Sequence, residues 1–319
     1  MKWLALLSLV LAGLALPLGC STETSNKNTN WLMACASDTD CGAASCVCGI
    51  CTVTCAAPGD ACAANSSVCA ASFAATTQCS GQPNSGICLA PCAQESDCEG
   101  SRTCVAGACV SRWHESCPAH PSALACSGFD VSAQPGWTPS LDSGAELSVV
   151  SAPRLAGSGA LLARTTSENA RSRFSQEFPK LGSGQLYLRA WLYSAPGSLL
   201  NNVHSLVVGD ANTADYGSKF VYAGGKLHVA AAGAALAGST DAPLGQWYCL
   251  RLELGIGDQG SVRAYLNDTL FVDATGVDTL PAAGVHNVTA GIDFAGQAEP
   301  AEVFLDELVL DTSPVACWD

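Results

Sequence analysis

The sequence predicts an all-β sandwich or jelly roll, preceded by a small disulfide-rich, loop-dominated segment. Three observations lead to this prediction. Seventeen of the 19 cysteines lie at or before Cys126. Beyond that residue, short segments with strand patterns are separated by Gly, Pro, Asn and Asp. Charged residues make up only 13% of the chain, and small residues take their place, which is typical of a β-rich protein with many turns.

The first 19 residues predict a signal peptide. Lys2 is followed by an apolar run over residues 3–18 and then by Gly19. A short basic start, an apolar stretch and a small-residue exit are typical of a secretory signal. The run is shorter than the ~20 residues that a membrane-spanning helix needs. We therefore expect an exported protein.

Residues 16–20 (LPLGC) resemble the lipobox of bacterial lipoproteins, in which the cysteine is diacylated and becomes the new N-terminus. Pro17 stands where the lipobox has an aliphatic residue. The resemblance implies a lipid on Cys20 and anchoring in the cell envelope, at the outer membrane because Ser21 rather than Asp follows. The alternative is a plain secreted protein. Removing Cys20 leaves an even number of cysteines to pair, which favours lipidation.

Residues 21–30 (STETSNKNTN) are polar and lack apolar periodicity, so we expect residues 20–34 to form a flexible, lipidated tether. Residues 35–126 form a cysteine-rich segment with an internal repeat. One copy has cysteines at positions 35, 41, 46 and 51, and the other at 92, 98, 104 and 109. Both copies carry Asp just before the second cysteine and a Gly before the last one.

Export favours disulfides over zinc in this segment, since disulfides persist in oxidising compartments. The acidic residues are too few and too close for calcium, so we expect solvated turns and no metal. Disulfides, each stabilising the folded state by about 2–4 kcal/mol, would take the place of an ordinary hydrophobic core in this segment. Cys117 and Cys126 are expected to close one loop at the boundary. The segment is predicted to act as a rigid spacer or a protein-contact module.

Residues 127–319 are predicted to form the sandwich. Its strands are expected at residues 145–151, 160–164, 171–178, 185–193, 203–208, 219–222, 226–231, 246–254, 261–266, 269–272, 286–294 and 301–310. Residues 230–238 are expected to be a loop or a weak strand, because they contain two glycines. Cys249 lies in a strong strand and Cys317 near the end of the chain. They are predicted to bridge each other, pinning the C-terminal residues to the sheet.

Four segments of this domain resemble concanavalin A-like, laminin-G-like jelly rolls. They are residues 185–193 (QLYLRAWLY), 245–253 (GQWYCLRLE), 262–267 (VRAYLN) and 303–310 (VFLDELVL). The resemblance covers roughly the last 190 residues and rests on the order and spacing of these segments. It implies two curved antiparallel sheets, with ligands on the concave face or its rim loops. Relatives include lectins, adhesion modules, glycosidases and polysaccharide lyases, so fold alone does not settle function.

Period-two alternation predicts a polar and aromatic stripe on the face opposite the apolar residues of three strands. If these strands are neighbours, the stripe lines one concave surface. Aromatic faces stack on sugar rings, and arginine binds carboxylates in a bidentate manner, which suits a glycan, including an acidic one. The predicted ligand-binding residues are Tyr187, Arg189, Trp191, Tyr193, His204, Arg251 and Glu253.

The chain has a net charge of −14 and no basic cluster, which argues against nucleic acid as a partner. We expect no cofactor. The function predicted first is a non-catalytic, glycan-binding lipoprotein displayed on the cell envelope. The first alternative is a polysaccharide lyase acting on an acidic glycan, because residues 171–174 (RSRF) and 202–204 (NVH) partly match the Arg and Gln-x-His motifs of alginate-lyase-like jelly rolls. Asn202 replaces the Gln, and no Tyr-x-Lys motif follows. The second alternative is a structural or adhesion module that contacts proteins.

Overall fold

The computed structural model describes residues 31–32, 37–47, 50–55, 62, 67–70, 86–98, 102–105, 107–111, 117, 120–132, 134–156, 158–198, 200–210, 217–297 and 300–317. The predicted signal peptide and Cys20 lie outside these residues. Within them, strands dominate, and the helices η1 (Asp38–Asp40) and η2 (Glu95–Asp97) are single 3-10 turns. In the described part of the chain, no helix has the length and apolar character needed to span a membrane.

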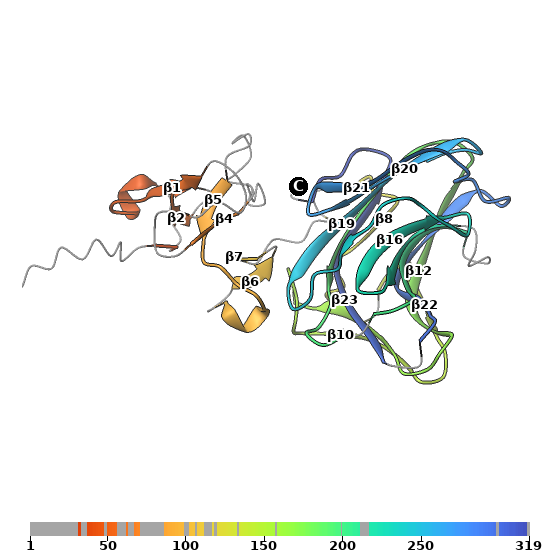
Figure 1. Cartoon of the computed structure of the whole chain (residues 1–319), viewed down its shortest axis with the longest axis horizontal. Coiled ribbons are helices and arrows are strands. Elements are labelled where there is room, and N and C mark those ends of the chain that lie inside the picture. The colour runs from red at the N-terminus through yellow and green to blue at the C-terminus, as the bar shows by residue number, and fades with distance from the viewer. Residues whose placement is uncertain are drawn as a thin grey trace, which may run out of the picture.

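Two large sheets form the β-sandwich on the right of Figure 1. The first, the ten-stranded sheet, has the order β10-β11-β23-β13-β19-β20-β21, with β8 on β23 and the hairpin β6–β7 on β19. Its strands are β6 (Arg102–Val105), β7 (Ala108–Ser111), β8 (Ala125–Ser127), β10 (Ala145–Val150), β11 (Ala160–Thr165), β13 (Gly184–Tyr193), β19 (Trp247–Ile256), β20 (Gly260–Leu266), β21 (Thr269–Val277) and β23 (Ala301–Asp311).

The second, the eight-stranded sheet, has the order β17-β16-β15-β14-β22-β12-β9, with β18 on β16. Its strands are β9 (Thr138–Leu141), β12 (Ala170–Leu181), β14 (Val203–Gly209), β15 (Gly217–Ala223), β16 (Lys226–Ala231), β17 (Ala234–Ala235), β18 (Thr240–Asp241) and β22 (Val285–Ala295). Two small sheets lie in the cysteine-rich segment. They contain β1 (Ser45–Val47), β2 (Ile50–Thr52), β3 (Thr54–Cys55), β4 (Val68–Ala70) and β5 (Gly86–Leu89).

The structure confirms the predicted all-β sandwich, and each predicted strand is present. The alternation read from the sequence sets which side chains enter the core. Leu186, Leu188 and Leu192 of β13 are fully buried between the sheets, facing residues such as Phe220 and Ile292 of the eight-stranded sheet. Burying each leucine side chain stabilises the folded protein by about 1.5–3 kcal/mol relative to leaving it exposed. The prediction missed the short strand β18 and also β9, which contains Pro139; proline is tolerated there because β9 is an edge strand.

The two cysteine repeats fold alike. In each copy the third and fourth cysteines face each other in a hairpin, Cys46 opposite Cys51 and Cys104 opposite Cys109. The second and fourth cysteines are bonded in both, as Cys41–Cys51 and Cys98–Cys109. Further bridges are Cys92–Cys104, Cys55–Cys69 and Cys62–Cys88.

The Asp before the second cysteine has a structural role in each repeat. The Asp40 carboxylate accepts a hydrogen bond from the Ser37 N–H, and the Asp97 carboxylate accepts from the N–H groups of Ala93 and Gln94. These bonds to backbone donors lower the pKa of Asp97. The carboxylates therefore close 3-10 turns, as the prediction of turn residues requires.

The cysteine-rich segment packs on the outward face of the ten-stranded sheet. Ile87 and Leu89 of β5 and Ala108 of β7 join a buried cluster with Trp191 and Trp247 of the sandwich. Val105 pairs with Trp247 in a parallel bridge, and the Gly107 N–H donates to Gln246 Oε1 at 2.6 Å. Figure 1 shows β6 and β7 at the side of the sandwich on which the C-terminal end lies. We call the buried cluster that contains Trp191, Tyr193, Trp247 and Phe304 of the sandwich, with Ile87, Leu89 and Ala108 of the cysteine-rich segment, the aromatic interface.

The predicted bridges Cys249–Cys317 and Cys117–Cys126 are both present. The first joins β19 to the C-terminal tail, and both of its cysteines are fully buried. It closes a loop with a sequence separation of 68, against 9 for the second bridge. In the chain-entropy description of disulfides, the longer loop stabilises the folded chain more, by about 2 kcal/mol.

We expect the double variant Cys249→Ala/Cys317→Ala to lose about 2 kcal/mol more free energy of unfolding than Cys117→Ala/Cys126→Ala. The measurement is urea unfolding of the two variants and the unchanged protein, followed by circular dichroism. A greater loss in the Cys117→Ala/Cys126→Ala variant would show that the tail does not hold the sandwich as described.

Candidate functional site

Six of the seven residues of the predicted stripe lie together on the ten-stranded sheet, on β13 and β19. Strands β13 and β19 are antiparallel neighbours, with Tyr187 opposite Glu253 and Arg189 opposite Arg251. Directly opposed residues share a face of the sheet. This face points away from the sandwich core, as alternation predicts.

That face is not open to a ligand at its aromatic end. Trp191 and Arg189 are 0% exposed, and Tyr193 is 7% exposed. The Tyr193 ring lies 5.7 Å from the rings of both Trp247 and Phe304. These aromatic side chains belong to the aromatic interface, where residues of the cysteine-rich segment cover them. The prediction that Trp191 and Tyr193 lie on an accessible ligand surface is therefore wrong.

The two arginines of the stripe hold the C-terminal tail. Arg189 donates to the Ala316 carbonyl at 3.3 Å, and Arg251 donates to the Val315 carbonyl at 3.2 Å. Arg251 also pairs with Asp268 at 3.1 Å. Its guanidinium lies over the Tyr265 ring and 4.0 Å from Glu253. A planar guanidinium has several donors, so it can make all of these contacts at once. The donors of Arg251 are therefore engaged within the protein itself.

His204 does not join the stripe. It lies in β14 of the eight-stranded sheet, opposite Phe294 of β22 and Val221 of β15. The prediction of one surface shared by His204, Arg189 and Arg251 is wrong, because alternation along a strand does not tell which sheet the strand joins. His204 is half-buried, with its ring 4.9 Å from the Phe294 ring.

The outward side of the eight-stranded sheet is rich in polar side chains. Core residues such as Phe174, Ala290 and Val288 identify its inner side, and their sequence neighbours point outward. We call this outward side the polar face and define it by Arg173, Ser175, His204, Lys219, His228, Asn287, Thr289 and Asp293. Arg173, Ser175, His204 and His228 are partly exposed, while the other four are buried.

An ion pair between Arg173 and Asp293 lies on the polar face. Their side chains are 13% and 1% exposed, so the Asp293 carboxylate is enclosed and Arg173 reaches solvent. Burial is the main cause that lowers the pKa of Arg173, and the nearby charge of Arg171 lowers it further. Asp142 opposes both effects. The buried carboxylate thus fixes the orientation of an arginine side chain that remains partly exposed.

A chain of polar groups continues the face along β12 and β22. Ser175 and Thr289 hydroxyls are 3.4 Å apart, and Thr289 donates to Asn287 Oδ1 at 3.2 Å. The Asn287 amide donates to the Gln176 carbonyl at 3.3 Å. In the next strands, Lys219 lies opposite Val207, which in turn lies opposite Thr289. The face therefore combines cationic groups with hydroxyl and amide groups held in fixed positions.

Other polar clusters are less suited to ligand binding. Asp306 and Glu307 are fully buried at a bulge of β23. Asp306 accepts hydrogen bonds from the N–H groups of Leu155 and Ala156, and burial followed by Glu307 raises its pKa well above the usual value. Asp306 therefore holds a loop, and both carboxylates are too deeply buried to reach a glycosidic bond.

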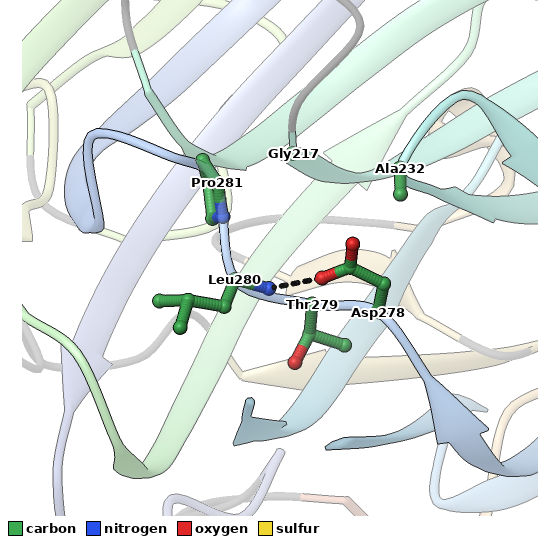
Figure 2. A pocket seen from close by; sticks show the side chains of 6 residues that line it. All are labelled: Gly217, Ala232, Asp278, Thr279, Leu280 and Pro281. Carbon is green, nitrogen blue, oxygen red and sulfur yellow. Dashed lines mark hydrogen bonds between the residues drawn. The ribbon is translucent and has the colours of Figure 1, made fainter. Parts of the chain in front are cut away.

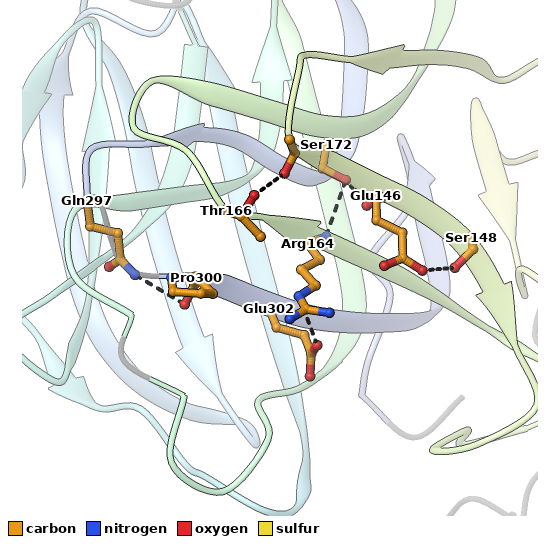
Figure 3. A network of polar contacts seen from close by, with 9 residues as sticks. Glu146, Ser148, Arg164, Thr166, Ser172, Gln297, Pro300 and Glu302 are labelled. Carbon is orange, nitrogen blue, oxygen red and sulfur yellow. Dashed lines mark hydrogen bonds and ion pairs between the residues drawn. The ribbon is translucent and has the colours of Figure 1, made fainter.

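Two hollows in the surface are also poorly suited to binding a ligand. The one in Figure 2, between Gly217, Ala232 and residues 278–281, has a volume of about 10 Å³, room for at most one water molecule. Figure 3 shows a polar network in which the Ser172 hydroxyl binds the Glu146 carbonyl and the Arg164 N–H. Nearby, Arg164 pairs with Glu302 at 3.9 Å beside a shallow hollow, and such exposed pairs are weak.

Most of the polar face was not identified from the sequence. His204 was predicted as a ligand-binding residue and also noted in a partial lyase motif, and Arg173 was noted only in the other partial lyase motif. Lys219, Asn287, Thr289 and Asp293 were missed. The alternating pattern of residues 287–290 (NVTA) is the signal that finds Asn287 and Thr289. Asp293 has no such signal, because a bulge interrupts the pairing of β14 with β22 next to it.

No family model and no curated protein matches this chain in sequence. Solved structures do resemble it. The cellulose-induced protein Cip1 is 17% identical, with a TM-score of 0.50, over 60% of this chain and 99% of its own. An endo-β-1,4-glucuronan lyase from the fungus Trichoderma reesei is 13% identical, with a TM-score of 0.44, over 56% and 92%. The alginate lyase AlgAT5 of polysaccharide lyase family 7 is 16% identical, with a TM-score of 0.39, over 55% and 93%. The likeness to Cip1 supports the jelly-roll fold.

We expect Trp191→Ala to destabilise the protein by about 3–5 kcal/mol, because it empties a large site in the aromatic interface. The measurement is the free energy of unfolding in urea. Leu270→Ala is the control, since Leu270 is 45% exposed on β21, and we expect it to change stability by less than about 1 kcal/mol. Equal, small effects of the two substitutions would show that Trp191 is not enclosed.

Proposed function

We propose that this chain is an exported lipoprotein that binds an acidic glycan on the polar face without cleaving it. In this proposal residues 127–319 form the binding domain and residues 35–126 form a crosslinked module that covers the opposite side. The observation that carries the proposal is the gathering of Arg173, Lys219, His204 and His228 on one face of a chain with net charge −14.

The chemistry of the face suits a sugar chain with carboxylate groups. Arginine offers a planar fork of donors that matches a carboxylate, and Asp293 holds this fork in place. The hydroxyls of Ser175 and Thr289 match sugar hydroxyls, which both donate and accept. The half-buried His204 ring, packed on Phe294, adds an aromatic surface.

The location of the proposed binding site follows from which face of the sandwich the rest of the chain covers. A sandwich has two outward faces, and here one carries the cysteine-rich segment and the C-terminal tail. There Arg189 and Arg251 each donate a hydrogen bond to a carbonyl of the C-terminal tail. In the described part of the chain, the aromatic interface includes no residue of the eight-stranded sheet. The polar residues of that sheet are organised before any ligand arrives, which limits the entropy cost of binding.

A polysaccharide lyase is the second candidate, and one observation favours it. Arg173 and His204, the two partial lyase motifs, lie on the same face of one sheet. A lyase would also need a group that protonates the departing sugar oxygen. Tyr222 points into the core, where it bonds Tyr248 at 2.7 Å, and burial raises its pKa well above the usual value. This tyrosine is unsuited to that role, so we place binding ahead of cleavage.

Export and anchoring complete the proposal. The disulfides fit an oxidising compartment outside the cytoplasm. The lipobox-like residues 16–20 support a lipid on Cys20. Several acyl chains on one protein give stable anchoring, since each buried CH₂ adds about 0.8 kcal/mol.

We expect the protein to bind tetragalacturonate, with an affinity that falls as salt concentration rises. The double variant Arg173→Gln/Asp293→Asn removes both charges together, so no unpaired carboxylate remains buried. It should weaken binding at least tenfold in isothermal titration calorimetry, the loss expected for one charge-assisted contact. Absorbance at 235 nm, followed in parallel, reports the unsaturated product of a lyase.

The control is Arg263→Gln/Asp273→Asn, which removes an exposed ion pair of 3.2 Å on the ten-stranded sheet. It should leave binding unchanged. Equal losses in the two double variants, or no binding by the unchanged protein, would contradict the proposed site. A rise in absorbance that His204→Ala abolishes would establish the lyase instead.

We expect Cys20 to be acylated when the full chain is produced in a Gram-negative bacterium. Metabolic labelling with an alkyne fatty acid should mark the protein and the control Cys126→Ala, which loses a disulfide cysteine, but not Cys20→Ala. Labelling that survives in Cys20→Ala would disprove the anchor, and an unlabelled protein in the medium would support plain secretion.

A further inference from the structure

A pocket opens at one edge of the sandwich, where the two sheets end. Strand β9 is the last of the eight-stranded sheet and β10 is the last of the ten-stranded sheet. Between them and β12 lies a pocket of about 550 Å³. This volume is in the range of small-molecule sites. The pocket is lined by Ser132, Gln134, Pro135, Trp137, Pro139, Leu141, Leu147 and Phe174.

The lining is mostly apolar and carries no charge. Pro135, Pro139 and Leu141 form an exposed rim, with Leu141 49% exposed. Trp137 and Phe174 are each 7% exposed and lie deeper. The Trp137 ring is held in place by Phe129, at 5.8 Å between ring centres. An uncharged lining disfavours an ionic ligand, because nothing there would compensate for the loss of its hydration.

Two buried polar atoms next to this pocket have no hydrogen-bond partner among the described residues. One is Trp137 Nε1, a donor, and the other is Gln176 Oε1, an acceptor. Gln176 follows Phe174 by two residues, on the same side of β12. Its amide nitrogen lies 3.7 Å from the position of a Cβ at Gly136, beside Trp137. A buried donor or acceptor left unbonded costs about 1–3 kcal/mol, so a ligand that bonds it gains affinity.

We propose that this pocket binds one ring of a neutral sugar. When the side chains that enclose these two atoms move aside, a sugar hydroxyl can accept from Trp137 Nε1 and donate to Gln176 Oε1, whereas an alkyl group leaves both atoms unbonded. The C–H groups of a pyranose ring pack against the prolines and Leu141 of the rim. The pocket is separate from the polar face, since Phe174 and Arg173 are successive residues on opposite sides of β12. The proposal therefore stands independently of the proposed function.

The experiment is isothermal titration calorimetry of the unchanged protein with cellotriose, xylotriose and mannotriose, each up to 10 mM as is usual for about millimolar affinity. We expect at least one of them to bind. Leu141→Lys, which places a charge on the rim, should weaken this binding at least tenfold. Trp137→Phe, which removes the donor and keeps a ring, should weaken it about tenfold.

Leu270→Lys is the matched control, since Leu270 is equally exposed but lies on β21, and it should bind like the unchanged protein. The double variant Arg173→Gln/Asp293→Asn should also bind normally. The proposal is overturned if none of the three sugars binds, or if Leu141→Lys binds as well as Leu270→Lys. It is also overturned if the loss occurs only in Arg173→Gln/Asp293→Asn, which would place neutral sugars on the polar face.

Discussion

The burial of Trp191 and Trp247 beneath the cysteine-rich segment is the contact on which the rest of this structure depends. Two tryptophans on the outside of a sheet would leave a large apolar surface in water, and Ile87, Leu89 and Ala108 remove it from water. The Cys249–Cys317 bridge and the bonds from Arg189 and Arg251 hold the tail at the same face. The crosslinked segment therefore completes an apolar cluster that the sandwich leaves open.

This cover also divides the sandwich into two faces with different roles. The ten-stranded sheet uses its aromatic and arginine side chains for internal contacts. The outward side of the eight-stranded sheet carries buried polar groups and does not contribute to the core. Apolar side chains at these buried positions would make the fold more stable. Buried polar residues such as Thr289 and Asp293 are costly unless bonded, and here they fix the positions of partly exposed neighbours. We interpret that arrangement as the organisation of a binding surface.

The sequence was sufficient to predict the sandwich because period-two alternation reports directly on burial by the opposite sheet. It also predicted the Cys249–Cys317 bridge, since these two cysteines are isolated from the others. Alternation correctly placed Arg189 and Trp191 on the outward side of β13. It carried no information on what covers that side, because the covering residue Leu89 is about 100 positions away in the chain. Strand order, which separates His204 from Arg251, is likewise a property of long-range pairing.

The most direct test of this account is a crystal structure of the protein with bound tetragalacturonate. We predict electron density for the sugar over the eight-stranded sheet, with a uronate carboxylate on Arg173. We also predict that Trp191 and Trp247 stay covered by Ile87 and Leu89 in the complex. Sugar density over the ten-stranded sheet, with the cysteine-rich segment displaced from the tryptophans, would contradict this account.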